Sequence, residues 1–559
     1  MANLQPDQNW VNYPQQPREN SGDRGGDNQP NAPIFKSNVW QSVVFWGGLL
    51  VLGLGGLGIR LWHITDLPYP VFDEVYFPAY AAEYLDGHPS WEGHPPLGKY
   101  FIMTAIALLG RNPLGCRVAE AFVGALIPIL AAGLTYQLTA RRWVGLLAGI
   151  LVGLDGLYLV ESRFGLINVF LVASGLSALI FLLAGLRLTP QDQQQDQKSD
   201  SVAQPISKFP WQRPWLLMGC GLQLGAAFSV KWNGLGFWLT VVILLGLSWG
   251  INLWHRLRFR FALAKDQLAP VNTSVNNLGF LGAMVRISWW EWLLCLGVMP
   301  IAMYVAQWLP HILLNPQRTL HDGLTGLGDL WQVFLALHRH ILWWHSSAEV
   351  VPTDPTKLVH PYCSPWYSWP VDARPVGYYF YRSDKSFIDV HALGNPILWW
   401  CSTGAVIFLT FRGLLVPFIS KAREKFNPTV AAILIGYTAN YLPWVITKRC
   451  LFIYHYMAAS LFSFMALALV LQWLWDSGST KAKTYQIANQ IAEVPTEKIP
   501  TKGKVTLGQG ICAVTLTAIA VTFVFFLPIW LGTPLSVPEF YWRMWFRPDI
   551  PRIPGFNWI

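Results

Sequence analysis

Long apolar stretches alternate with short polar ones along almost the whole chain. A helix needs about 20 apolar residues to cross the hydrocarbon core of a bilayer, and most of these stretches approach or exceed that length. We predict membrane spans at residues 39–62, 114–138, 143–160, 164–186, 214–230, 233–252, 289–309, 397–414, 428–446, 451–475 and 509–531. The pattern therefore predicts an all-α integral membrane protein with about 11 transmembrane helices.

The polar segments between the spans divide into two groups. Three of them, 187–213, 253–287 and 476–508, are rich in Lys and Arg or in other solvated residues. Two longer segments, 63–113 and 310–396, contain many Trp, Tyr and His residues instead. Because basic loops stay on the cytoplasmic face of a membrane, we predict that the first group forms inner loops and the second group outer loops.

The two ends of the chain differ from its centre. Residues 1–37 are rich in Gln, Asn, Pro and Gly and show no signal-peptide pattern, so we predict a disordered cytoplasmic tail. Residues 38–531 are predicted to form the transmembrane domain, and residues 532–559 an aromatic tail on the outer face. No internal repeat of the kind that marks many secondary transporters is visible.

The composition narrows the class of protein. Hydrophobic residues make up 53% of the chain and charged residues only 13%, whereas soluble domains contain roughly a quarter charged residues. The formal charge of +9 comes from short basic clusters between the spans, so it indicates loop orientation and not nucleic-acid binding. The 7 Cys residues show no metal-type spacing, and the sequence assigns no role to Cys363.

An acidic pair, Asp73-Glu74, follows the first predicted span. Adjacent side chains on a helix point about 100° apart, so the two carboxylates cannot act symmetrically on one atom. A carboxylate at the edge of a bilayer is a candidate general base with a raised pKa. We predict that Asp73 is this base and that Glu74 binds or orients another group, with two solvated loop acids as the alternative interpretation.

Four basic residues occupy the outer ends of predicted spans: Arg117, Arg163, Lys231 and Arg449. Each one alone is equally well explained as an anchor that reaches toward the membrane surface. Four cations on the face that holds the acids suggest a bound anion, such as a phosphate.

The outer loop 310–396 contains 7 of the 12 His residues. The spacing of His338, His340 and His345 matches no standard metal site on a helix, so we expect hydrogen-bonding His residues and predict no metal. The run Tyr362–Pro370 is rich in Trp and Tyr, which predicts an aromatic platform that packs on the membrane or stacks on a sugar or peptide.

Several of these residues belong to a longer pattern that resembles a known family. The segment Phe72-Asp73-Glu74, followed by His94-Pro95-Pro96-Leu97-Gly98-Lys99, is similar to the first-loop signature of the protein O-mannosyltransferases, membrane glycosyltransferases of the GT-C class. Further similar positions follow in order: Arg117, Ser162-Arg163, Lys231-Trp232, Ser364–Pro370, Arg374-Pro375, Gly394-Asn395-Pro396 and Tyr454-His455-Tyr456. The resemblance covers most of residues 70–460.

This resemblance implies a GT-C polytopic helical bundle and a reaction. Family members transfer mannose, with inversion, from a polyprenyl-phosphate carrier to Ser or Thr hydroxyls of translocated proteins, here at the outer face of a bacterial plasma membrane. Asp73 would be the base, and Glu74 an acceptor or sugar contact. The residues expected to bind substrate are His94, Lys99, Arg117, Arg163, Lys231, Arg374, Arg449 and His455, of which Arg117 and Lys231 would hold the carrier phosphate.

The chemistry of this reaction limits what else is needed. A lipid phosphate is a good leaving group, so one base and cationic stabilisation suffice and no cofactor is expected. The implied partners are the polyprenyl-phosphate sugar donor, a Ser/Thr-containing secreted protein, membrane lipids and the secretion machinery, but no nucleic acid.

Two departures from the family pattern leave alternatives open. The loop 310–396 is too short for the soluble β-trefoil insert of eukaryotic members, which implies a bacterial-type enzyme. Asn168 stands where many members have Asp after Ser162-Arg163, so a lipid or glycan acceptor is an alternative to a protein. A non-catalytic transporter is a third interpretation, based on composition alone.

Overall fold

The computed structural model describes residues 34–89, 93–188, 212–263, 278–314, 327–347, 351, 359–415, 426–491, 505–547 and 556–559. Its longer helices are α1 (Ile34–Leu61), α3 (Leu97–Leu109), α4 (Pro113–Thr139), α5 (Arg142–Gly153), α7 (Asn168–Arg187), α8 (Gln212–Val230), α9 (Leu235–Leu263), α14 (Leu327–Ser346), α15 (Pro396–Thr410), α17 (Pro428–Tyr441), α18 (Met457–Ile491) and α19 (Leu507–Leu531).

Short elements connect these helices. They are η1 (Phe72–Val75), α2 (Phe77–Leu85), α6 (Gly156–Glu161), η3 (Trp232–Gly234), α10 (Phe280–Met284), α11 (Trp289–Leu293), η5 (Leu294–Val298), α12 (Met299–Ala306), α13 (Trp308–Leu314), η7 (Trp366–Val371), β1 (Val376–Arg382), β2 (Ser386–Ala392), η8 (Phe411–Leu415), η9 (Leu442–Ile446), η10 (Ile453–Tyr456), β3 (Leu535–Ser536) and α20 (Val537–Arg543).

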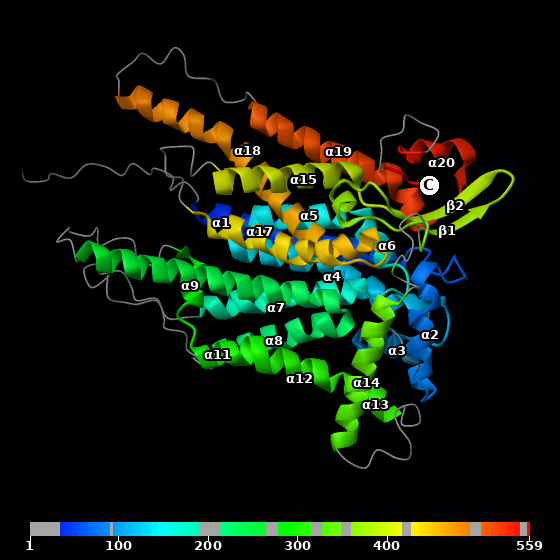
Figure 1. Cartoon of the computed structure of the whole chain (residues 1–559). Helices are drawn as coiled ribbons and strands as arrows, with labels where there is room; N and C mark the ends of the chain where they lie inside the picture. Colours follow the sequence, from blue (N-terminus) through cyan, green and yellow to red (C-terminus); the bar gives the residue numbers. More distant parts are fainter. Residues whose placement is uncertain are drawn as a thin grey trace, which may run out of the picture.

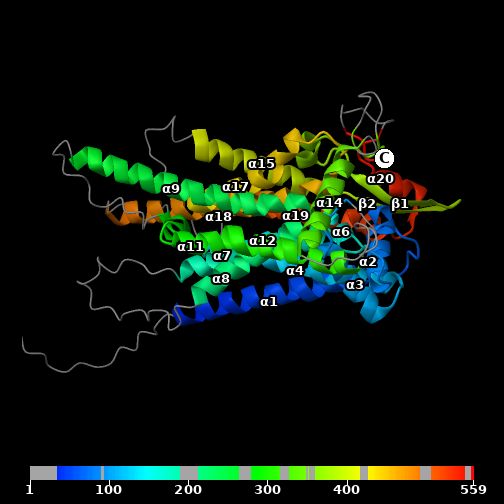
Figure 2. The same cartoon turned by 60° about the horizontal axis from the view of Figure 1, so that its bottom comes forward.

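The long helices lie side by side and form a bundle (Figure 1). The elements α2, α3, β1, β2 and α20 gather at one end of it in both views (Figures 1 and 2). We call this the loop end, which also holds η1, and we call the opposite end, which holds Arg141 and Arg412, the basic end. The two predicted outer loops, 63–113 and 310–396, thus meet at the loop end.

Eight helices within the described residues are long and apolar enough to cross a membrane: Val39–Leu61, Pro113–Thr139, Asn168–Arg187, Trp232–Arg258, Trp289–Leu314, Pro428–Ile446, Ile453–Ser477 and Leu507–Leu531. Each one coincides with a predicted span. The three other predicted spans coincide with α5 and α6, with α8, and with α15 and η8, which do not meet the same conditions. The chain is therefore an integral membrane protein with several transmembrane helices, and the predicted number of 11 is not confirmed.

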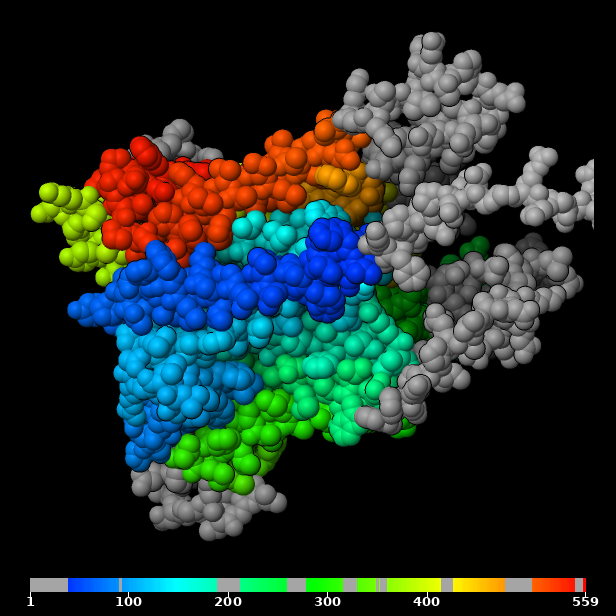
Figure 3. Space-filling model, turned by 180° about the vertical axis from the view of Figure 1, so that it is seen from behind, coloured from blue at the N-terminus to red at the C-terminus, as the bar shows by residue number. Residues whose placement is uncertain are grey.

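The degree of burial separates central helices from peripheral ones. Of the apolar windows of the spans, that of α7 is 78% buried, whereas that of α1 is 11% buried. Figure 3 shows α1, in dark blue, along the surface of the bundle. Its large side chains Trp46, Leu50 and Leu54 are exposed, as expected for a helix that faces lipid.

The predicted span 143–160 is broken between α5 and α6, and the break is held by Asp155. The side chain of Asp155 accepts hydrogen bonds from the Tyr158 backbone N–H at 3.1 Å and from Trp399 Nε1 at 2.7 Å. The backbone N–H of Asn395, the N-cap of α15, also donates to Asp155 at 3.1 Å. The Gly394-Asn395-Pro396 motif therefore fixes the start of α15 against the break, after which α6 carries Glu161 to the loop end.

A small antiparallel sheet, ordered β1-β2-β3, accompanies the helical bundle and was not predicted. Val376 pairs with Ala392 and Arg382 with Phe387, and Phe387 pairs in turn with Leu535 of the predicted aromatic tail. The register shifts between Gly377 and Tyr379, so Tyr378 has no partner in the ladder. Such a bulge redirects a side chain, and it sends Tyr378 toward the site described below.

Several predicted boundaries lie within or next to residues outside the described ranges. The tail at 1–37 lies outside the described residues up to residue 33, and α1 begins at Ile34. Residues 189–211, 264–277 and 492–504 of the predicted inner loops also lie outside them. Beside these loops, α9 continues to Leu263 and α18 to Ile491, beyond the predicted span ends.

A disulfide joins Cys363 to Cys450, whose Cα atoms lie 5.2 Å apart. It connects the long loop at 310–396 to the segment between η9 and η10. The backbone N–H of Ser364 donates to the Leu451 carbonyl at 2.8 Å beside it. Because Arg449 precedes Cys450, the disulfide anchors a residue of the candidate site.

Replacing Cys363 and Cys450 with serine is expected to lower the unfolding free energy by about 2–4 kcal/mol, because the cross-link restricts the unfolded chain. The measurement is thermal unfolding of the purified protein with and without the double substitution. The control Cys401→Ser removes a free, half-buried thiol and is expected to have a much smaller effect. Equal losses in the two variants would contradict a structural disulfide.

Candidate active site

The one-turn helix η1 places the acidic pair at the loop end. Phe72, its first residue, has a φ of +47°, in the left-handed region that side chains other than Gly seldom adopt. This conformation costs about 1–3 kcal/mol, which packing must offset. The Phe72 ring stacks on Tyr378 with centroids 4.6 Å apart and planes 3° apart. Phe72 is thereby held in place, and Glu74 is buried while Asp73 is only half-buried.

Glu74 forms a buried ion pair with Arg117 of α4. Arg117 Nε and Nη2 donate to the two Glu74 oxygens at 2.6 and 2.8 Å. The backbone N–H of Gly165 also donates to Glu74, at 2.9 Å. The Nη groups of Arg117 donate further to three backbone carbonyls, those of Ile64, Leu67 and Tyr69. All five N–H donors of Arg117 are therefore used within the protein.

Asp73 faces a group of polar side chains. The Tyr454 hydroxyl donates to Asp73 Oδ2 at 3.4 Å. Burial raises the pKa of Asp73, and the positive charges of Lys231 and Arg449 act in the opposite direction. Asp73 is thus a carboxylate with a raised pKa beside two cations, which is an arrangement suited to a general base next to an anion site.

Lys231, just before η3, is held by both an amide and an aromatic ring. Its Nζ donates to Asn168 Oδ1 at 3.1 Å and lies 5.2 Å from the centroid of the Tyr454 ring. Asn168 Nδ2 donates in turn to Glu161 Oε2 at 2.8 Å. The residue that departs from the family pattern, Asn168, therefore connects the cation Lys231 to the buried carboxyl of Glu161.

Glu161 ends this chain of hydrogen bonds. The Tyr378 hydroxyl, directed by the bulge in β1, donates to Glu161 Oε1. Burial raises the pKa of Glu161 to about 7, although the hydrogen bonds from Tyr378 and Asn168 favour the ionised form. Because Phe72 stacks on the same Tyr378 ring, the chain is connected to the turn that carries Asp73.

Arg449 is held between two imidazoles. Its Nη1 donates to His345 Nδ1 at 3.2 Å and its Nη2 donates to His455 Nε2 at 3.0 Å. Since a guanidinium can only donate, these two nitrogens accept, and both rings are neutral. The other nitrogens then carry the protons: His345 Nε2 donates to the Gly93 carbonyl and His455 Nδ1 to the Phe452 carbonyl, each at 2.9 Å.

The neutral imidazoles leave Arg449 as the charged group of this cluster. Burial, with Arg449 as the second cause, lowers the pKa of His345 to about 4. His94 lies against His345 with ring centroids 5.5 Å apart, and burial lowers its pKa well below the usual range. Within the described residues, no three His, Cys, Asp or Glu side chains are grouped so that they could hold a metal ion.

Comparison with known proteins decides the family. Residues 50–116 and 110–314 match the model of dolichyl-phosphate-mannose-protein mannosyltransferase. Residues 330–548 match the model of the C-terminal four-TMM region of protein O-mannosyltransferase. Together the two models cover most of the chain. The chain belongs to the protein O-mannosyltransferase family.

Relatives of similar length support this assignment. A polyprenol-phosphate-mannose–protein mannosyltransferase of Mycobacterium tuberculosis is 23% identical over 513 residues, which covers 87% of this chain and 88% of the relative. The protein of the same name from Corynebacterium glutamicum is 24% identical, with 95% and 98% covered. The Saccharomyces cerevisiae Pmt1-Pmt2 complex bound to the sugar donor has a similar fold, with a TM-score of 0.64 at 16% identity over 93% and 94% of the two chains.

In this protein O-mannosyltransferase, the ten predicted site residues do not form one cluster. Five of them lie close together and define the candidate site: Asp73, His94, Lys231, Arg449 and His455. Lys99 is buried beside them, where its Nζ donates to the His94 carbonyl at 3.2 Å. Family membership also argues against the alternative of a non-catalytic transporter.

Three predicted substrate-binding arginines have hydrogen-bond partners within the protein, and their contacts with substrate stay predictions. The hydrogen bonds of Arg117 go to Glu74 and to backbone carbonyls, so this mannosyltransferase has no Arg117 donor left for the carrier phosphate. Arg163 Nη1 donates to the carbonyls of Ile59, Arg60 and Trp62 at the end of α1. Arg374 Nη1 donates to the carbonyls of Asn557 and Ile559. Glu74 likewise accepts hydrogen bonds from Arg117 and from the Gly165 backbone N–H, and its contact with the acceptor or sugar stays a prediction.

Four residues of the site were missed: Glu161, His345, Tyr378 and Tyr454. Glu161 could have been found from the sequence. A carboxyl between two predicted spans is costly to bury, so its presence there indicates a function. Tyr454 belongs to a family motif but offered no chemical reason to be chosen. His345 lies 104 residues from Arg449 in the sequence, and no spacing rule connects the two.

Replacing Lys231 or Arg449 with a neutral side chain tests the anion site. We expect Lys231→Met or Arg449→Gln to weaken binding of the lipid-phosphate donor about 10- to 100-fold, because each removes one charged hydrogen-bond donor. The measurement is the Kd for polyprenyl phosphate, which requires no turnover. Lys448→Gln is the control, because Lys448 is adjacent to Arg449 but exposed. An unchanged Kd in both site variants would show that Lys231 and Arg449 do not bind the phosphate.

Proposed function

We propose that this protein transfers a mannosyl residue from polyprenyl-phosphate-mannose to Ser or Thr hydroxyls of translocated proteins, with inversion at the anomeric carbon. The observation that carries the proposal is the position of Asp73, a half-buried carboxylate that lies beside Lys231 and Arg449 at the loop end. The names of the mycobacterial and corynebacterial relatives give the same donor and a protein acceptor.

The proposed reaction is a single displacement. Asp73 accepts the proton of the acceptor hydroxyl while the hydroxyl oxygen forms a bond to the anomeric carbon of mannose. The bond between that carbon and the phosphate oxygen breaks, and its electron pair leaves with the polyprenyl phosphate. Lys231 and Arg449 stabilise the charge that develops on the phosphate. One displacement inverts the anomeric centre, and as proposed it requires no cofactor.

We place the loop end on the outer face of a bacterial plasma membrane. The basic loops would then lie in the cytoplasm, in agreement with the positive-inside rule. The Cys363–Cys450 disulfide lies at the loop end, and disulfides persist in oxidising compartments outside the cytoplasm. On this face the acceptor protein would meet the site as it leaves the secretion machinery, with the donor arriving from the surrounding lipids.

A lipid or glycan acceptor is the second candidate. Asn168 favours it, because the amide occupies a family Asp position next to Lys231 and an acidic contact to a peptide is absent there. The two candidates share the base, the donor and the phosphate site. They differ only in the molecule that brings the hydroxyl.

The test supplies both acceptors together. Purified protein in lipid nanodiscs receives polyprenyl-phosphate-mannose with labelled mannose, a Ser/Thr-rich peptide and extracted membrane lipids. We expect label on the peptide, lost when Ser and Thr are replaced by Ala. Label on the lipid or glycan fraction alone would favour the second candidate. No transfer to either fraction, with donor binding intact, would overturn the proposed function.

A further inference from the structure

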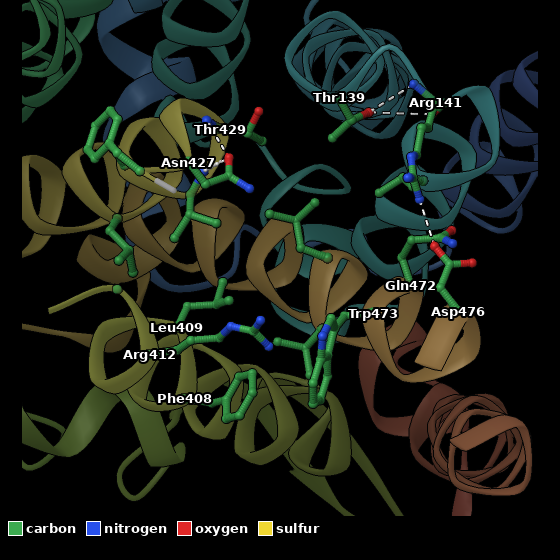
Figure 4. A pocket seen from close by; sticks show the side chains of 18 residues that line it. Thr139, Arg141, Phe408, Leu409, Arg412, Asn427, Thr429, Gln472, Trp473 and Asp476 are labelled. Atoms are coloured by element: carbon green, nitrogen blue, oxygen red, sulfur yellow. Dashed lines mark hydrogen bonds and ion pairs between the residues drawn. The ribbon is translucent and has the colours of Figure 1, made fainter. Parts of the chain in front are cut away.

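The acceptor must be bound close to Asp73, and the cavity at the basic end is too far away for this. That cavity has a volume of about 940 Å³ and is lined by Thr139 and Arg141, among other residues. Arg141 Nη1 donates to Asp476 Oδ2 at 2.8 Å (Figure 4). Arg117 and Thr139 are 22 positions apart on α4, so the helix separates the cavity from the loop end by about 33 Å. The acceptor contact therefore lies at the loop end.

Asp73 has one occupied and one open carboxylate oxygen. Its Oδ2 accepts from the Tyr454 hydroxyl at 3.4 Å, whereas Oδ1 has no hydrogen-bond partner among the described residues. Lys231 and Arg449, the cations assigned above to the carrier phosphate, act on Asp73. The imidazole of His360 is a further neighbour and also interacts electrostatically with Asp73.

His360 is fixed by its own turn and by two aromatic rings. The backbone N–H of Cys363 donates to the His360 carbonyl at 3.0 Å, and Cys363 is cross-linked to Cys450. The His360 ring lies at a steep angle to the rings of Phe72 and Phe452, with centroids 6.0 and 5.3 Å apart. The turn and the disulfide thus anchor this imidazole beside η1.

The hydrogen bond to His360 Nδ1 determines where the ring carries its proton. The backbone N–H of Tyr362 donates to Nδ1 at 3.2 Å, so the imidazole is neutral and its proton is on Nε2. Burial, the largest cause, lowers the pKa of His360, which favours the same neutral form. No described residue accepts a hydrogen bond from Nε2, and the side chain is only partly buried. Nε2 is therefore an N–H donor that a ligand can use.

Asp73 Oδ1 and His360 Nε2 together offer one open acceptor and one open donor. A Ser or Thr residue in a peptide carries the complementary groups, a hydroxyl that donates and a backbone carbonyl that accepts. The carbonyl is uncharged and suits a neutral imidazole, whereas the phosphate is charged and suits the cations Lys231 and Arg449.

We propose that His360 Nε2 donates a hydrogen bond to the backbone carbonyl of the Ser or Thr residue whose hydroxyl Asp73 deprotonates. His360 is thus a binding residue for the acceptor, and it transfers neither the proton nor the sugar. Every Ser and Thr in a peptide has this carbonyl, so the contact favours a peptide acceptor without distinguishing the two residues. The inference rests on the proposed function, because it concerns the acceptor of that reaction.

Binding of acceptor peptides without turnover tests the contact. The whole protein in nanodiscs is saturated with polyprenyl phosphate, and the Kd is measured for two peptides that differ only at the last residue, serine amide or ethanolamide. Ethanolamide keeps the hydroxyl and lacks the carbonyl. We expect the wild-type protein to bind the serine amide about tenfold more tightly, and His360→Ala to bind both peptides equally. The wild-type preference retained in His360→Ala would overturn the proposal, as would a wild-type protein without this preference.

Two further variants separate binding from folding. His360→Gln keeps an N–H donor and should restore part of the preference, whereas a purely structural role would make it behave like His360→Ala. His88→Ala is the matched control and should keep the full preference, because His88 is an exposed imidazole near the surface residue Asp86. The preference is a ratio of two Kd values for one protein, so partial unfolding of a variant does not change it.

Turnover distinguishes a failure of this contact from a failure of the proposed function. In His360→Ala the KM for the serine amide should rise about tenfold while kcat and the Kd for polyprenyl phosphate change little, because the hydrogen bond is present before and during transfer. Transfer by the wild-type protein with an unchanged KM in His360→Ala would refute the contact alone. Absence of transfer by the wild-type protein would refute the proposed function, and the ratio of Kd values would still decide whether His360 binds the carbonyl.

Discussion

Replacing Asp73 with asparagine is expected to lower the rate of mannosyl transfer by about 10²–10⁴-fold, because the amide cannot accept the proton of the acceptor hydroxyl. Donor binding should change little, since Lys231 and Arg449 remain in place. The measurement is kcat for transfer to a peptide together with the Kd for polyprenyl phosphate. A variant with normal kcat would remove Asp73 from the role of base.

The pH dependence gives an independent readout of the same residue. Asp73 acts only when ionised, so activity should fall as the pH drops through its pKa. Burial raises this pKa, and the fall should therefore occur above the value of about 3.9 expected for an exposed Asp. The profile of kcat/KM against pH measures it, and the acid limb should be absent from the residual activity of Asp73→Asn.

The matched control for both experiments is Asp86→Asn. Asp86 lies in the same predicted loop, and it pairs with Arg111 on the surface. Its loss should leave the transfer rate and the acid limb unchanged, because an exposed ion pair contributes little. If Asp86→Asn reduced kcat as strongly as Asp73→Asn, substitutions anywhere in the loop would lower activity. The loss in Asp73→Asn could then not be assigned to a missing base.

Breaking the Glu74–Arg117 pair is expected to destabilise the fold by about 3–5 kcal/mol, because one buried charge then remains without its partner. Arg117→Met also leaves the carbonyls of Ile64, Leu67 and Tyr69 without donors. We expect the melting temperature to fall while the donor Kd of the folded fraction stays unchanged. A large rise in the donor Kd with normal stability would show that Arg117 binds the phosphate.

Two comparisons sharpen this experiment. The surface pair Arg111–Asp86 belongs to the same region, and Arg111→Gln should change the unfolding free energy far less, because an exposed ion pair contributes little. The double variant Glu74→Gln with Arg117→Met should lose less stability than the sum of its two single variants, because each single change already breaks the pair. Additive losses would show that the two residues act separately.

Sequence patterns were sufficient for the bundle because apolar stretches of span length have few other solutions. They also singled out the loop that holds Asp73, since a charge beside a span calls for an explanation. They did not identify the hydrogen-bond and ion-pair partners of the site residues. Arg117 and Lys231 look alike in the sequence, yet Arg117 is enclosed by Glu74 and three carbonyls while Lys231 reaches Asn168. Only tertiary packing distinguishes the two cations.

The sheet and the His cluster lay beyond the reach of local patterns. β1 is an aromatic-rich segment of 7 residues, and the same composition fits an interfacial loop. Its pairing with β2 and the bulge at Tyr378 depend on register, which periodicity does not give. His345 and Arg449 are brought together by α14 and the segment held by the disulfide, so their contact has no counterpart in sequence spacing.

The Cys363–Cys450 bond also bears on how the protein is made. Cys363 leaves the ribosome first, and in the predicted topology α15 and α17 both cross the membrane before Cys450 reaches the same side. A chain that failed to insert this helical hairpin would keep both thiols apart. Formation of the disulfide would therefore report that both helices are inserted correctly. Thiol labelling during synthesis would distinguish correctly inserted chains, in which these two thiols are lost, from incorrectly inserted ones.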